Sequence, residues 1–310
     1  MTHAWAAEMG RIELKSLEQV KWMREAGLVV ADIHRSLREA ARPGITTREL
    51  DAVSAQAIRR AGATSNFLNY AGYPATVCIS INDVVVHGIP GERTLEEGDL
   101  VSFDCGAWVS RNGREWHGDA AFSMIVGDEW IPDEEFAQGK RAMGAAPGGL
   151  SDERIRRRRE LDAVTRESLW AALANLEGAR RVSAVGAAVE DVVALNADEL
   201  GWEAGIIEEY TGHGIGTAMH QEPEILNYNA RGISAKLKPG MVLAVEPMLT
   251  AGGIETFTED DEWTVRTCDG SDAAHWEHTV AILSEGISVL TATDFGKAGL
   301  APFGVVPVEL

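Results

Sequence analysis

The same order of elements occurs twice along this chain: two helical stretches and then a run of short strands. In the first half, residues 16–41 and 46–61 place apolar side chains at helical spacing, and both stretches begin with a capping-box pattern. Short β-branched runs separated by turn residues follow over 76–126. The first half is therefore expected to form two helices and an antiparallel sheet.

The second half repeats this order. Helices are expected over 153–176 and 183–200, the latter closed by Gly201, and strands are expected over 205–290. The two halves share their order of elements rather than their residues. The repeat predicts an α+β domain in which two pseudo-twofold-related helix-helix-strand halves surround a central antiparallel sheet and one cleft.

The remaining segments are expected to lie outside this repeat. We divide the chain into a short leader (1–16), a single domain (17–290) and a C-terminal tail (291–310). The stretch 128–159 begins as a polar segment that becomes rich in glycine, alanine and proline, which is typical of a surface insert. The tail has no hydrophobic periodicity, so we expect it to be loose.

Composition excludes several classes of protein. The formal net charge is -20, which gives no electrostatic reason to expect nucleic-acid binding. No apolar stretch is long enough to cross a bilayer, so no membrane association is expected. Cys78, Cys105 and Cys268 are an odd, widely spaced set, which argues against a disulfide framework and predicts a reducing, cytoplasmic location.

One basic cluster stands out in this acidic chain. It consists of Arg154 and the run from Arg156 to Arg159. We interpret it as a solvated helix face. A docking patch for ribosomal RNA or an acidic partner is the alternative.

Acidic residues and one histidine in strand-like contexts suggest a metal centre. Apolar neighbours such as Phe103 and Val245 indicate burial, and buried carboxylates need cations or other partners. Four carboxylates and one imidazole form an oxygen-rich set suited to two divalent first-row metals such as Mn, Fe, Co or Zn. Two such ions can activate a water molecule between them, which is typical of a hydrolase. The five candidate ligands are Asp104, Asp119, His213, Glu246 and Glu277.

The sequences around these ligands are more specific than the ligands alone. In order, they are VVVHGIP, SFDCG, HGDAAF, GHGIG, MHQEP, AVEPML and WEHTV. Together they resemble the type I methionine aminopeptidases of the pita-bread metallopeptidase fold, over nearly the whole stretch 17–290. The resemblance implies a catalytic pita-bread domain that removes the initiator methionine from nascent polypeptides and peptides with a small second residue. We expect a cytoplasmic, monomeric enzyme.

The resemblance also assigns the metal ligands. It implies that Asp119 and Glu277 bridge two divalent ions. Asp104 would bind one ion alone, while His213 and Glu246 complete the coordination of the other. The identity of the ions stays open among Co, Mn, Fe(II) and Zn, because a carboxylate-rich set accepts several metals.

Three residues are expected to take part in catalysis. By the same resemblance, Glu246 would also transfer a proton from the attacking water to the departing amine. His220 would stabilise the developing oxyanion, and His87 would contact the region of the scissile bond.

An apolar pocket would accept the methionine side chain, because sulfur packs well against aromatic ring edges. The resemblance places His87 and His220 beside the substrate and assigns the remaining pocket positions to Phe67, Tyr70, Tyr73, Cys78, Met219 and Trp263.

The other histidines are assigned by their surroundings. His117 and His278 lie beside candidate ligands in the sequence, so we expect them to orient those ligands. His3, His34 and His275 are expected to be structural.

Two departures from the family and two alternatives complete the sequence analysis. The segment between Asp104 and Asp119 is longer than expected, which a longer hairpin would absorb. The position of the insert 128–159 would let it either overhang the cleft or touch the ribosome. An Xaa-Pro aminopeptidase or prolidase would share the five ligands, although such relatives usually carry an N-terminal domain. A non-catalytic pita-bread adaptor would typically have lost ligands that are all present here.

Overall fold

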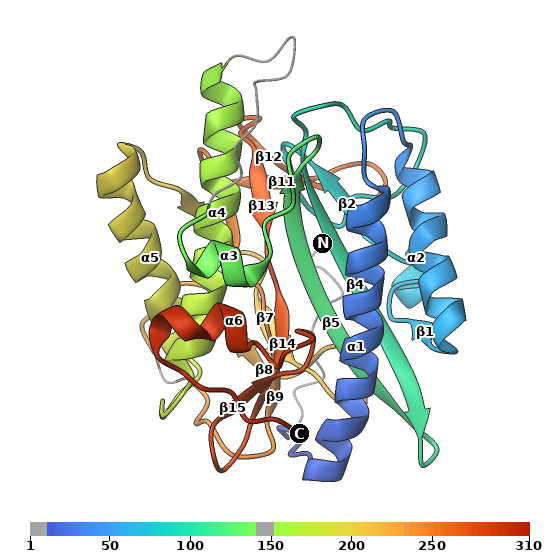
Figure 1. Ribbon diagram of the computed structural model, residues 1–310, viewed down its shortest axis with the longest axis vertical. Coiled ribbons are helices and arrows are strands. Elements are labelled where there is room, and N and C mark those ends of the chain that lie inside the picture. Colours follow the sequence, from blue (N-terminus) through green and yellow to red (C-terminus); the bar gives the residue numbers. More distant parts are fainter. Residues whose placement is uncertain (1–10, 141–151, 233) are drawn as a thin grey trace.

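The structure is a computed structural model that describes residues 11–140, 152–232 and 234–310 (Figure 1). The helices of the first half begin and end where the sequence predicts. The elements of this half are α1 (Leu17–Ala40), α2 (Thr47–Ala61), β1 (Thr64–Ser65), the 3₁₀ turn η1 (Tyr70–Gly72), β2 (Cys78–Ile81), β3 (Val84–Val86), β4 (Leu100–Arg111) and β5 (Arg114–Ile125).

The second half repeats this order after a short helix. Its helices are α3 (Asp133–Ala137), α4 (Asp152–Asn175), α5 (Ala184–Leu200) and α6 (Lys297–Leu300), with η2 (Ala301–Phe303) after them. Its strands are β6 (Gly205–Ile206), β7 (Gly212–Gly214), β8 (Gln221–Ile225), β9 (Val242–Val245), β10 (Met248–Thr250), β11 (Thr256–Thr258), β12 (Val265–Thr267), β13 (Ala273–His275), β14 (His278–Ile282) and β15 (Ile287–Val289).

Capping explains why the first two helices begin where they do. The Ser16 hydroxyl accepts a hydrogen bond from the backbone N–H of Gln19, and the Gln19 side chain accepts one from the backbone N–H of Ser16. Thr46 and Glu49 form the same reciprocal pair at the start of α2. Each pair satisfies donors that a helix leaves unpaired at its N-terminus.

The described strands form four hydrogen-bonded sheets, all with antiparallel pairs. In the first half, β1, β4 and β2 lie in that order and β5 pairs with β4; in the second half the order is β15-β14-β9-β7-β8. These two sheets meet where the backbones of Ala121 and Glu277 exchange two hydrogen bonds of 2.9 and 3.3 Å. Helix α1 contacts β4 and β5, whereas α4 and α5 lie together on the other side of Figure 1. The expected two-half α+β arrangement is confirmed.

The long hairpin expected between the first two ligands is formed by β4 and β5. Their ladder is continuous from Leu100 opposite Ile125 to Arg111 opposite Arg114. Asn112 and Gly113 make the turn with φ of 52° and 70°, which is the left-handed geometry that two-residue hairpins favour. The extra residues therefore lengthen the hairpin without changing the register near the ligands.

Helix α1 lies directly on the strand that carries one ligand. A Cβ atom on Gly118 would lie 2.8 Å from the backbone nitrogen of Gly27, closer than side chains come to a backbone. A Cβ atom on Gly27 would lie 2.2 Å from the carbonyl oxygen of Leu290. Glycine at both positions thus permits a backbone contact immediately before Asp119.

The C-terminal tail is packed, so the expectation of a loose tail is wrong. Ala292 and Leu300 are buried. The buried Arg24 guanidinium of α1 donates hydrogen bonds to the carbonyls of Leu290 at 2.6 Å and Thr293 at 2.8 Å. An irregular segment can be held by its backbone carbonyls, which leaves no periodic pattern in the sequence.

The described part of the insert does not overhang the metal cleft. Helix α3 packs against α6, and none of the side chains of 128–140 lines the cavity that holds the candidate ligands. The part over 141–151 lies outside the described residues. The remainder, 152–159, begins α4.

The arginine cluster is not the solvated face that we expected. Arg158 is 2% exposed and binds Asp272 through two nitrogen atoms. Arg154 also binds Asp272, and Arg159 binds Asp128 through two bonds of 2.7 Å. Arg156, which contacts two neighbouring glutamates, is exposed and fits the expectation, and Arg154 is equally exposed.

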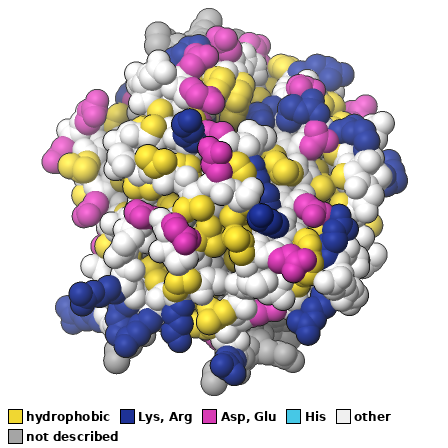
Figure 2. All heavy atoms as spheres, turned by 60° about the horizontal axis from the view of Figure 1, so that its bottom comes forward, with side chains coloured by type: hydrophobic (Ala, Val, Ile, Leu, Met, Phe, Trp, Pro, Cys, Tyr) yellow, Lys and Arg dark blue, Asp and Glu magenta, His cyan; other side chains and the backbone are white. Residues whose placement is uncertain are grey.

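Two surface properties follow from the described residues. Figure 2 shows basic and acidic side chains interspersed over one face rather than separated by sign. Among the helices described, none combines the length and apolar character that a membrane span requires.

Candidate metal centre

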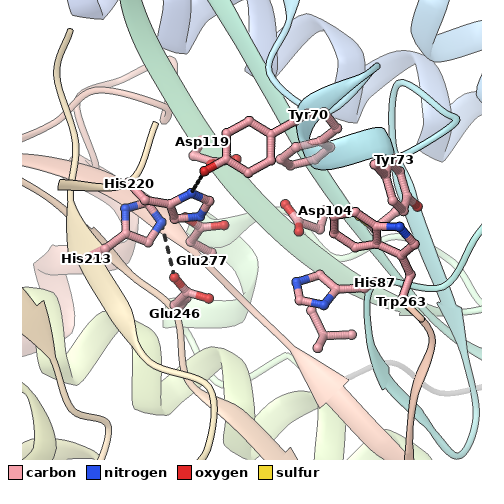
Figure 3. Close-up of a pocket in the computed structure, with 13 residues that line it drawn as sticks. Tyr70, Tyr73, His87, Asp104, Asp119, His213, His220, Glu246, Trp263 and Glu277 are labelled. Carbon is pink, nitrogen blue, oxygen red and sulfur yellow. Dashed lines mark hydrogen bonds and ion pairs between the residues drawn. The ribbon is translucent and has the colours of Figure 1, made fainter. Parts of the chain in front are cut away.

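A cavity of about 50 Å³ lies between the two halves, with 13 residues lining it (Figure 3). All five candidate ligands contribute to it, although they come from distant parts of the chain. Of the predicted pocket residues, Phe67, Tyr70, Tyr73, Cys78, His87, His220 and Trp263 line it as well. Met219 is the exception, because it packs behind the lining.

Strand register brings the carboxylates together. Asp119 lies opposite Gly106 and Ala121 lies opposite Asp104 in the β4–β5 ladder, so both aspartates project from one face of the hairpin. Glu246 directly follows β9, and Glu277 directly precedes β14. The pairing of Val245 with His278 makes these two glutamates neighbours. We call these four side chains the carboxylate wall.

The fifth ligand is held in a suitable tautomer. His213 lies on β7, and its Nδ1 is 3.0 Å from the carbonyl oxygen of Gly214. A carbonyl can only accept, so Nδ1 carries the proton and Nε2 has a free lone pair. That Nε2 lies 3.5 Å from Oε1 of Glu246.

The donor set fits a bound cation. Single ligand atoms of Asp119, His213 and Glu277 all lie within 4.8 Å of one another. Among the described residues, buried oxygens of Asp104, Asp119 and Glu277 have no hydrogen-bond partner. Buried acceptors without donors are costly, and a divalent cation would satisfy them. The oxygen-rich set with one imidazole suits first-row divalent metals.

Burial raises the pKa of every carboxyl group in the wall. Desolvation raises the pKa of Asp104 to about 7. The pKa values of Asp119, Glu246 and Glu277 are also raised, first by burial and then by neighbouring carboxylates. Without a cation, the wall would therefore hold protons near neutral pH.

Burial acts on the imidazoles in the opposite direction. Desolvation lowers the pKa of His213 to about 4. The pKa of His220 is lowered by burial and then by the charge of His213. We call these two rings, whose centroids are 4.3 Å apart, the imidazole wall.

The two predicted catalytic histidines occupy different sides of the cavity (Figure 3). His220 Nδ1 lies 3.0 Å from the Tyr70 hydroxyl. His87 has a φ of 61°, and its ring meets Trp263 edge-on with centroids 6.0 Å apart. Pairing of β3 with β12 brings His87 and Trp263 together from opposite halves of the chain.

An apolar cluster forms the end of the cavity near Trp263. Phe67, Tyr73, Cys78 and Met219 are buried in one group, against which Tyr70 and Trp263 pack. The rings of Tyr73 and Trp263 meet edge-on at 5.1 Å. This surface could accept an apolar side chain that contains sulfur.

Three residues near the site were not predicted to belong to it. His275, expected to be structural, places Nε2 3.7 Å from Oε2 of Glu246. Asn66 accepts a hydrogen bond from His117 Nδ1 at 2.9 Å, and Tyr210 packs edge-on against His87. For His275, its position two residues before Glu277 in an extended segment is a signal that sequence reasoning missed.

The remaining histidines have separate roles. His34 donates from Nε2 to the carbonyl of Ala120 at 2.9 Å, which confirms a structural role. His278 Nδ1 lies 2.8 Å from the hydroxyl of Thr291, on the side of the strand away from the cavity. His3 lies outside the described residues.

Comparisons with known proteins agree with this geometry. The model of metallopeptidase family M24 matches residues 21–284. The chain belongs to the metallopeptidase family M24. This M24 chain is 43% identical to methionine aminopeptidase 1 of Mycobacterium tuberculosis, covering 89% of its own length and 94% of the relative. Methionine aminopeptidase 1 of Bacillus subtilis is 37% identical, with 89% and 98% covered.

Solved structures show the same relationship. A methionine aminopeptidase from Thermotoga maritima superimposes with a TM-score of 0.75 and 33% identity, covering 91% of this M24 chain and 99% of that chain. A prolidase from Pyrococcus furiosus has a TM-score of 0.60 and 19% identity, and only 65% of it is covered. The second similarity shows a shared fold alone.

Proposed function

We propose that this M24 chain is a methionine aminopeptidase, which removes the N-terminal methionine from nascent proteins and peptides with a small second residue. The observation that carries the proposal is the meeting of five metal-ligand side chains and an apolar aromatic surface in one cavity. Relatives named methionine aminopeptidase match almost their full length.

The carboxylate wall and His213 would hold two divalent ions. Asp119 and Glu277 would bridge them, Asp104 would complete one site, and His213 with Glu246 would complete the other. When bound, the ions would lower the pKa of water and polarise the substrate carbonyl. Mn, Fe(II), Co and Zn are all candidates, since the same donor atoms suit each of them.

The chain's own residues would orient the peptide and move protons. If the Tyr70 hydroxyl donates to Nδ1 of His220, the proton of that imidazole lies on Nε2, and His220 can donate to the oxygen on which charge develops. Glu246 would accept a proton from the attacking water and deliver it to the departing amine. His87, opposite His220, would contact the peptide near the scissile bond.

The apolar cluster would select methionine. Phe67, Tyr73 and Cys78 offer ring edges and a polarisable sulfur atom to the thioether, with Tyr70 and Trp263 at the margin. Met219 would support this surface from behind. Restricted space beside the cleaved bond would then favour a small second residue.

The alternatives receive less support. The Pyrococcus prolidase is larger and shares only the fold with this chain. An adaptor without catalytic activity would not need unsatisfied carboxylate oxygens buried around one point.

The proposal for partners is limited to substrate peptides. We place the activity in the cytoplasm, where nascent N-termini emerge, and assign it to a monomer. Acidic side chains bind Arg154, Arg158 and Arg159, which weakens the electrostatic case for contact with the ribosome.

Mass spectrometry of two peptides tests the activity. Metal-free protein would be reloaded separately with Mn, Fe(II), Co or Zn and incubated with Met-Ala-Ser and Met-Leu-Ser. We expect metal-dependent release of methionine from the first peptide and little from the second. Binding of two ions without release from either would contradict the proposal and direct the assay to Xaa-Pro peptides.

A further inference from the structure

A second cavity, of about 470 Å³, lies on the helix-covered side of the molecule. It shares no lining residue with the metal centre. Helix α1 forms one wall, and the insert with the start of the tail forms the other; in Figure 1 these elements flank β5. The insert therefore builds a pocket that the proposed aminopeptidase reaction does not use.

The most unusual group in this cavity is the guanidinium of Arg38. Its faces are covered by two rings, Phe122 at 5.2 Å and Trp130 at 4.5 Å from the ring centroids. In the part of the chain that the structure describes, the guanidinium has no hydrogen bond or ion pair. Burial lowers the pKa of Arg38 to about 10, which shows that its charge is poorly solvated.

A second donor faces the same cavity. The Thr291 hydroxyl oxygen accepts a hydrogen bond from the backbone N–H of Thr279 at 3.1 Å, and the hydroxyl can donate its hydrogen to Nδ1 of His278, 2.8 Å away. The imidazole proton then lies on Nε2. No described residue accepts a hydrogen bond from this Nε2, and His278 lines the cavity.

Most acids that line the cavity already have donors. Asp133 accepts hydrogen bonds from Arg166 and Trp170, and Asp294 accepts them from backbone N–H groups after it. Asp32 binds Arg35 and Arg60. Only Glu134, which is exposed, has no such contact among the described residues. The groups inside the cavity without a hydrogen-bond partner among the described residues therefore include the N–H donors of Arg38 and His278, although the charge of Asp133 also attracts Arg38.

From this arrangement we infer that the cavity binds a small organic carboxylate with an apolar body. The N–H groups along one edge of the Arg38 guanidinium match the two oxygens of a carboxylate. The aromatic rings packed against the guanidinium hold it in one orientation. His278 offers a further donor. Phe122, Trp130 and Trp276 provide aromatic surface for the remainder of the ligand.

Calorimetric titration with benzoate tests the site in the full chain, both metal-loaded and after metal removal. We expect one benzoate to bind with a Kd on the order of 1 mM, as suits so small a ligand. Arg38→Met keeps the length of the side chain and removes the charge; affinity should fall about tenfold or more. Arg38→Lys keeps the charge but lacks the two-pronged edge, and should weaken binding by a smaller factor.

Arg48→Met is the matched control. Arg48 lies on α2 outside the cavity and is exposed, and its guanidinium already binds Glu92. Benzoate affinity should not change in this variant. Melting temperatures of all three variants would establish that each is folded.

Four results would overturn the inference. One is the absence of benzoate binding to the wild-type protein. The second is an equal loss of affinity in Arg38→Met and Arg48→Met. The third is binding that disappears with the metal and persists in Arg38→Met, which would place benzoate at the metal centre. The fourth is equal affinity for inorganic phosphate, because phosphate would leave the aromatic surface unused and exclude an apolar ligand body.

Discussion

The carboxylate wall and the imidazole wall share one cavity and similar burial, yet burial changes their proton affinities in opposite directions. Desolvation raises the pKa of Asp104 to about 7 and lowers that of His213 to about 4. Both changes favour the neutral form. The difference is that neutral imidazole is ready to bind a metal, whereas a protonated carboxyl group must first lose its proton. The carboxylate wall therefore depends on cations far more than the imidazole wall does.

Removing a carboxylate that we propose to bridge the two ions should have the largest effect. Glu277→Gln should lower methionine release by roughly 10³-fold or more, because both ions lose a charged ligand. The same change should leave the metal-free protein as stable as wild type or more stable, since it removes a buried acid without a partner. Peptide assays, metal analysis and urea unfolding would measure these effects.

Glu285→Gln is the matched control for that prediction, because Glu285 is exposed and lies outside the cavity. Full metal content in Glu277→Gln would contradict the ligand assignment. A large loss of activity in the control would show that the assay reports folding instead.

Within the imidazole wall, removing His220, which is not a proposed ligand, should affect turnover without affecting the ions. His220→Ala should lower kcat by about 10²-fold to 10³-fold, the usual cost of losing an oxyanion donor, with little change in metal content. Tyr70→Phe should give a smaller decrease, because His220 keeps its ring but loses its hydroxyl partner. Steady-state kinetics with metal analysis would separate these effects, and unchanged kcat in His220→Ala would refute the proposed role.

The two walls should also give opposite pH dependence in the metal-free protein. Folded Asp104 keeps its proton up to about pH 7, whereas its ordinary pKa is 3.8, so its contribution to the free energy of unfolding falls as pH rises between these values. His213 has a folded pKa of about 4 against an ordinary 6.5, so its contribution rises with pH over that interval.

Asp104→Asn would isolate the contribution of this carboxyl group to the pH dependence of the free energy of unfolding. Relative to metal-free wild type, the variant should gain on the order of a few kcal/mol of stability between pH 4 and pH 7. Urea unfolding at several pH values would measure the difference. Parallel pH profiles for the two proteins would contradict it.

The smallest expected effect concerns the apolar cluster. Cys78→Ala removes one polarisable sulfur atom from the methionine surface and should raise KM a few-fold with little change in kcat. Cys268→Ala, a change at an exposed cysteine, is the control. A larger change in kcat than in KM would mean that Cys78 acts on the reacting groups.

The sequence alone was sufficient to predict features whose signal is local or is carried by specific motifs. The caps at Ser16 and Thr46 define the first two helices, and the motifs singled out five candidate ligands that line one cavity. Contacts between distant segments left no comparable signal. His275 approaches Glu246, and Arg158 binds Asp272, only because separate elements pack together in the folded chain.

The contact between Arg24 and the tail has a consequence for biosynthesis. Arg24 emerges from the ribosome early, but the carbonyls of Leu290 and Thr293 that it binds are made last. Glu277 is also synthesised late. The two aspartates of the first half therefore stay exposed until almost the whole chain has been made. A prematurely terminated chain would therefore have no partial activity. Because Arg24 would lack its backbone partners in the tail, such a chain would be open to degradation.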